Sequence, residues 1–236
     1  MSNALSHAPF RVDFMMCAPV QMDYLPTHLD GLLSWALLQE RLALFTEGAV
    51  DHAPDPTDLE CDIYTNLPLA KENDTFCASV ILPQEVLGSS TRFYTRSSDA
   101  NALASISIDD AHTSKGVILN QSRMRQIQTA RGQLKTCLNT EQVMHSPVFT
   151  AYGVGEIDRV RELLCTHVFG LGKNRAKGFG SLRFIDVSPD VDAKEYWKLR
   201  AMRDKEDGYI PMVTPLRPPY WNKAAARIAY MPKDVL

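Results

Sequence analysis

The sequence predicts an α+β fold made of two β–α–β units separated by an insertion and followed by a C-terminal extension. Two observations carry this class. Residues 10–17 alternate between apolar and polar side chains, and this period of two is typical of a half-buried strand. Residues 28–45 place apolar side chains on one broad helical face, and a second strand, helix and strand pattern follows in residues 148–187.

Composition places the chain among globular proteins. Its 236 residues are enough for one large domain or two small ones with a hydrophobic core. With 45% hydrophobic and 22% charged residues, the composition is typical of a globular protein. There is no run of eighteen apolar residues, and the N-terminus lacks the pattern of a secretory signal, so we expect no contact with a membrane. The five cysteines form no CxxC pair, which favours a reducing, cytoplasmic location and excludes a thiolate zinc site. We expect no cofactor and no metal.

The first part of the core is expected to occupy residues 1–82. After the strand at 10–17, Thr27 is a candidate N-cap for the long helix, with Asp30 in its first turn. Residues 47–60 are rich in Asp and Pro and are expected to form a loop. Residues 67–70 and 76–82 are predicted strands around a turn at Asn73 and Asp74.

Residues 83–147 have no clear periodicity, and we interpret them as an insertion that lies over the main sheet. Charge changes sign along the chain here. Residues 1–110 carry 5 Lys/Arg against 16 Asp/Glu, whereas residues 111–183 carry 11 against 4. A basic middle in an otherwise acidic chain favours a local site for a polyanion. The alternative is a solvated basic face that pairs with the acidic half.

The second part of the core, residues 148–187, begins with a strand at 148–154 and continues with a helix at 156–167. A glycine-rich segment at 170–180 leads to a last strand at 181–187. The order β–α–β, insertion, β–α–β fits a ferredoxin-like sheet with helices on one face. The extension, residues 188–236, is rich in proline and aromatic residues and is expected to wrap the surface or dock on a partner.

The glycine-rich segment is the most informative motif of the chain. Four glycines allow unusual backbone conformations, close approach of a ligand to the main chain, and an anion-binding nest of N–H groups. Three cations lie between these glycines, so a phosphate backbone is the natural ligand. Asn174 stands where a P-loop needs Ser or Thr, and Arg175 stands where a dinucleotide fingerprint needs glycine. The alternative is a helix C-cap followed by a flexible turn.

The pattern Gly-hydrophobic-Gly, five residues, Gly-hydrophobic-Gly before the last strand resembles the glycine-rich loop of the RAMP proteins of CRISPR systems. Pro19 and Val20 after the first strand also agree, and the resemblance covers about residues 10–46 and 148–187. The segment from Arg217 to Trp221 and the overall layout look most like the Cas-five-type subunit of type IV systems. This resemblance implies an antiviral subunit that holds the 5′ handle of the guide CRISPR RNA and caps one end of a ribonucleoprotein. It implies other Cas subunits as partners and leaves contact with target DNA open.

The resemblance also implies which residues bind RNA. In the glycine-rich segment the loop backbone comes from the glycines, and the side chains between them contact phosphates: Gly170, Gly172, Lys173, Asn174, Arg175, Lys177, Gly178 and Gly180. From the residues themselves we add two basic pieces of the insertion, in which cations alternate with rings or stand in pairs. These are Arg92, Arg96, Arg123 and Arg125. The alternative for Arg92 and Arg96 is a strand with one charged face and one aromatic face.

We predict that the protein binds CRISPR RNA without catalysing a reaction. The first alternative is a Cas-six-type endoribonuclease that processes the guide precursor without metal, because the chain resembles those proteins too. His28, Tyr24 and Lys173 would then supply acid, base and cation. A single histidine without a visible partner is a weak catalytic signal. The second alternative is a protein-interaction module without RNA, which leaves the glycine-rich segment unexplained.

Overall fold

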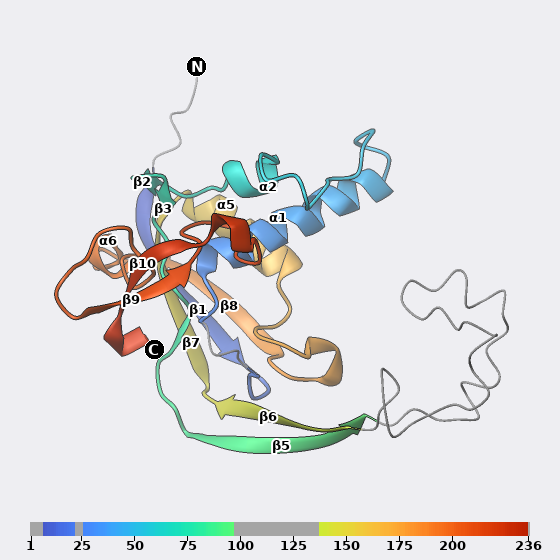
Figure 1. Cartoon of the computed structure of the whole chain (residues 1–236). Coiled ribbons are helices and arrows are strands. Elements are labelled where there is room, and N and C mark those ends of the chain that lie inside the picture. The colour runs from blue at the N-terminus through green and yellow to red at the C-terminus, as the bar shows by residue number, and fades with distance from the viewer. Residues whose placement is uncertain (1–6, 22–25, 97–136, 236) are drawn as a thin grey trace, which may run out of the picture. The chain divides into compact units, whose positions relative to one another are not determined.

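The computed structural model describes residues 7–21, 26–96 and 137–235 (Figure 1). The chain divides into two compact units, residues 1–90 with 143–236 and residues 91–142. No helix within the described ranges is long and apolar enough to cross a membrane. Of the predicted site residues, Arg123 and Arg125 lie outside the described residues, as does Tyr24.

A four-stranded antiparallel sheet forms the centre of the first unit. Its order is β4 (Leu82–Pro83), β7 (Val148–Gly155), β1 (Ala8–Met16) and β8 (Leu182–Pro189). β1 pairs with β7 on one side and with β8 on the other, so that Phe14 faces Phe149 and Ile185. With the helices α1 (Leu29–Thr46) and α5 (Ile157–His167) between strands, the chain order is β–α–β–β–α–β. This confirms the predicted ferredoxin-like α+β fold.

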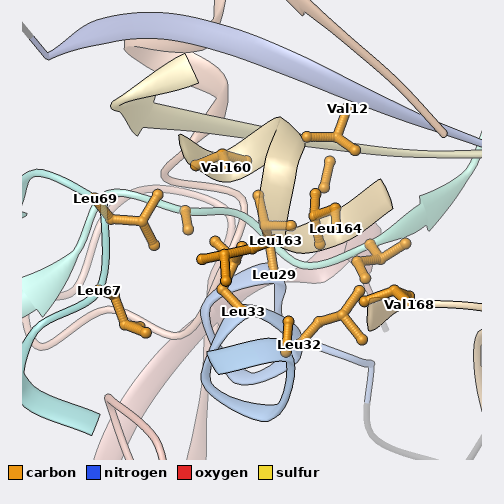
Figure 2. Packing of buried hydrophobic residues seen from close by; sticks show 14 of the residues in the cluster. Val12, Leu29, Leu32, Leu33, Leu67, Leu69, Val160, Leu163, Leu164 and Val168 are labelled. Atoms are coloured by element: carbon orange, nitrogen blue, oxygen red, sulfur yellow. The ribbon is translucent and has the colours of Figure 1, made fainter. Parts of the chain in front are cut away.

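The core lies between the sheet and the two long helices. Side chains alternate between the two faces of β1, and the inward-facing Phe10, Val12 and Phe14 are completely buried. Leucines of α1 and leucines and a valine of α5 belong to the same cluster, and Figure 2 labels Leu29, Leu32, Leu33, Val160, Leu163 and Leu164 among them. Each buried aliphatic side chain of this kind contributes about 1.5–3 kcal/mol to folding, so this cluster fixes both helices on the sheet.

Two further strand pairs and several short elements complete the described part of the chain. β5 (Gly88–Arg96) pairs with β6 (Cys137–His145), and β9 (Tyr209–Thr214) pairs with β10 (Arg227–Pro232). The others are α2 (Asp62–Thr65), β2 (Lys71–Glu72), β3 (Thr75–Phe76), η2 (Arg175–Lys177), α6 (Ala193–Tyr196), η3 (Lys223–Ala225) and η4 (Lys233–Val235).

The N-cap predicted for the long helix is wrong. The helix begins at Leu29, its N-cap is His28, and no side chain caps it. The turn at Asn73 and Asp74 is present, with φ of 48° and 64°. The strands predicted around it are shorter than expected. Leu69 and Ala78 contact β7 through isolated bridges, and only Leu82 and Pro83 form a ladder with it.

The C-terminal extension also contributes to the hydrophobic packing of the fold. Its β9–β10 hairpin packs a second hydrophobic cluster around Val80, Leu216 and Met231. The red C-terminal segment also lies against α1 in Figure 1, where the Tyr220 hydroxyl donates a hydrogen bond to Asp30 over 2.8 Å. The extension therefore covers the N-terminal end of α1.

Candidate nucleic-acid interface

The glycine-rich segment is anchored on the connection that follows β1. The Lys173 N–H donates to the Gln21 carbonyl and the Gly180 N–H donates to the Pro19 carbonyl, both over 2.8 Å. A Cβ added at Gly172 would overlap the Gln21 carbonyl oxygen. The lack of a side chain at Gly172 therefore lets this segment lie close to the chain's own backbone.

Gly180 closes the segment on itself. Its carbonyl accepts a hydrogen bond from the Leu171 N–H over 2.8 Å, and its φ is +63°. An added Cβ would overlap the Leu171 carbonyl oxygen, so only glycine fits here. Gly170 is buried as well, and it forms an isolated antiparallel bridge with Ser181, the residue that follows Gly180.

Residues 173–178, which we call the basic arch, project between these two anchors. Asn174 and Gly178 have positive φ, 55° and 88°, and flank the single 3₁₀ turn η2. The Lys177 N–H donates to the Asn174 carbonyl, and the Gly178 N–H donates to the Arg175 carbonyl. The Lys173 and Gly180 N–H groups are also bonded within the chain, so these four N–H groups are not available to an anion.

The three cations of the arch have different surroundings. Lys173, Arg175 and Lys177 are all exposed. The Arg175 guanidinium lies 4.6 Å from the centre of the Trp35 ring on α1, a cation–π distance. Arg175 thereby braces the arch on α1. The Asn174 side chain donates to the Gln21 side-chain oxygen over 2.7 Å and holds the base of the arch.

A pocket of about 520 Å³ lies beside the arch. One part of its wall comes from the glycine-rich segment, residues 170–173 and 175, and another part comes from residues 218–221 of the extension. The side of α1 that carries Gly31, Ser34 and Trp35 contributes to the lining. Its aromatic lining residues are Trp35, Tyr64, Tyr220 and Trp221.

The wall formed by the extension is held by a buried ion pair. Arg200 and Asp30 are fully buried, and Arg200 Nη1 lies 3.0 Å from Asp30 Oδ2. The Arg200 Nη2 donates to the Tyr220 hydroxyl over 2.7 Å and to the Leu216 carbonyl, while Nη1 also donates to two carbonyls near β3. Burial lowers the pKa of Arg200, but its attraction to Asp30 and Tyr220 and its hydrogen bonds with them together more than offset this, so the pKa is raised overall.

His28 lies under Tyr220 in the lining of the same pocket. The two rings stack with their centres 4.2 Å apart, and His28 is only 7% exposed. Burial and the nearby positive charge of Arg200 hold the pKa of His28 well below its usual value, so the ring is neutral at pH 7. Within residues 7–21, 26–96 and 137–235, neither its buried Nδ1 nor the buried hydroxyl of Ser34 on the next turn of α1 has a hydrogen-bond partner.

The structure brings together the eight predicted residues of the glycine-rich segment. Arg92 is exposed on β5, and Arg96 ends that strand; both belong to the second unit. Phe93 and Tyr94 are exposed beside Arg92, so the expected alternation of cations and rings is present on this strand.

Sequence reasoning missed the aromatic pocket. Trp35 was assigned only to the apolar face of the helix, and Trp221 only to a segment that supports the family resemblance. A usable signal existed, because Pro-Pro-Tyr-Trp places two large rings together after two rigid residues. Arg200 gave no signal, since its partner Asp30 is 170 residues away in sequence.

Comparison with known families gives a match over almost the whole chain. The model of the family described as CRISPR type IV associated protein Csf3 matches residues 8–232. A search of curated proteins finds no match.

Proposed function

Because the chain belongs to the Csf3 family of type IV CRISPR-associated proteins, we propose that it is the subunit that holds the guide RNA at the basic arch. Membership makes the chain a CRISPR-associated subunit with other Cas proteins as partners. The finer assignment is that it binds the 5′ handle of the CRISPR RNA, caps one end of the complex and catalyses no reaction.

The observation that supports this proposal most is the construction of the arch. Two backbone hydrogen bonds, from Lys173 to Gln21 and from Gly180 to Pro19, anchor its ends on the fold. Between them, three exposed cations stand within five residues. A preorganised cationic loop favours a phosphate backbone, because binding releases condensed counterions at little cost in loop entropy.

The proposed mechanism is capture of phosphates by Lys173 and Lys177, with Arg175 contributing charge from its place over Trp35. Such contacts position a strand without reading its sequence. Sequence would be read by base pairing of the guide, while the protein holds its backbone and shape.

The endoribonuclease remains the second candidate, because His28 and Lys173 line the same pocket. Two features weigh against it. The His28 ring is covered by Tyr220, and its exposed fraction is 7%. A general base must reach the 2′-hydroxyl that it deprotonates, and the stacked Tyr220 ring covers one face of His28.

The test is to incubate the purified protein with labelled CRISPR repeat RNA in EDTA and to run native and denaturing gels. We expect a shifted band that is intact on the denaturing gel. A Lys173→Ala/Lys177→Ala variant should shift the RNA weakly. The matched control, Lys194→Ala/Lys205→Ala, removes two exposed lysines elsewhere and should shift the RNA as the wild type does.

Two outcomes would contradict the proposal. A discrete cleavage product that is lost in a His28→Gln variant would make the protein the guide-processing nuclease. Absence of any shift for the wild type at low salt would favour the protein-interaction module instead.

A further inference from the structure

We propose that the pocket beside the basic arch takes one unpaired nucleobase of the RNA strand that the arch holds. This inference rests on the proposed function and deepens it, because it adds a base site to a phosphate site. It also gives a role to the Tyr220-Trp221 segment, which phosphate binding leaves unused.

The shape and lining of the pocket fit a flat ring. Its volume of about 520 Å³ lies in the range of small-ligand pockets. Trp35 and Trp221 lie among its lining residues, and Trp221 is 60% exposed although it is a large apolar ring. An exposed tryptophan beside a cationic loop is the arrangement that single-strand binders use to stack a base next to a captured phosphate.

The charged residues in the pocket lining indicate that the ring belongs to the RNA strand held by the arch. Lys173 and Arg175 belong both to the arch and to the lining of the pocket. A base that enters the pocket is therefore tied to a phosphate that reaches the arch. Tyr220 keeps this wall in place, since it packs 3.2 Å from the position of a Cβ at Gly31 and bonds to the buried Asp30.

The experiment is an abasic scan of the CRISPR repeat RNA, with affinity measured by fluorescence anisotropy. We expect one position at which loss of the base weakens binding to the wild type about tenfold, the effect of one stacked base. In Trp221→Ala the RNA should still bind through the arch, and the loss at that position should disappear. The control Tyr196→Ala removes an exposed ring that does not line the pocket, and it should keep the loss.

RNA that binds with the same abasic profile in the wild type and in Trp221→Ala would overturn the base site and leave the arch intact. RNA that does not bind the wild type at all would overturn the proposed function, and the base site with it.

Discussion

Two glycines of the same segment should respond very differently to alanine. Gly178 and Gly180 both have positive φ, +88° and +63°, so alanine is strained at either position by about 1–2 kcal/mol. At Gly178 nothing lies within 4 Å of the added Cβ. Alanine also restricts the unfolded chain, which returns about 0.4–1 kcal/mol, so Gly178→Ala should cost about 1 kcal/mol or less.

Gly180→Ala adds a steric penalty to the same strain. The new Cβ would overlap the Leu171 carbonyl oxygen, and the backbone must move to relieve it. This breaks the hydrogen bonds from the Leu171 N–H to Gly180 and from Gly180 to the Pro19 carbonyl. At about 1 kcal/mol each, their loss brings the total to about 3 kcal/mol.

Equilibrium urea unfolding followed by far-UV circular dichroism measures both variants under the same conditions. The expected difference between Gly180→Ala and Gly178→Ala is about 2 kcal/mol. Equal losses for the two variants, or a larger loss for Gly178→Ala, would refute the division of the segment into an anchor and a projecting arch.

Three further predictions concern the pocket and its supports. Arg200→Met should cost about 3–5 kcal/mol in thermal or urea unfolding, because it strands the buried Asp30 carboxylate, and a second change, Asp30→Leu, should recover part of the loss. Tyr220→Phe should cost about 2 kcal/mol, since it removes one hydroxyl bonded to both charged groups but keeps the ring on His28; a loss near zero would contradict the network. Because folding lowers the pKa of His28, only the unfolded state gains that proton as pH falls below about 6.5. The free energy of unfolding should therefore fall there by about 1.4 kcal/mol per pH unit, a component that His28→Gln abolishes.

The fold was predictable because its central elements have simple periods. β1 is buried at alternate positions, Phe10, Val12 and Phe14, and α1 has a continuous apolar face. The edge strand β4 was harder to predict, because only Leu82 and Pro83 pair with β7 in a regular ladder. Local propensity also favoured Thr27 as a cap, whereas tertiary contacts start the helix one residue later, where Leu29 donates to the Ser79 carbonyl.

The site was predictable as a segment but not in its detail. The glycine pattern indicates that something approaches the backbone closely, yet it does not say whether this is a ligand or the chain itself. Here the neighbours of Gly172 and Gly180 are the chain's own carbonyls. The pocket depends on Tyr220, whose hydroxyl bonds to both members of the buried ion pair between residues 30 and 200, and no local pattern encodes such a distant pair.

The most direct test of the central claim is the salt dependence of RNA binding. Each phosphate contact to a single strand contributes about 0.7 to the slope of log affinity against log salt. Lys173→Ala/Lys177→Ala should therefore reduce this slope by about 1.4, while Lys194→Ala/Lys205→Ala should leave it unchanged. If the arch variant keeps the wild-type slope, the arch does not hold the RNA backbone.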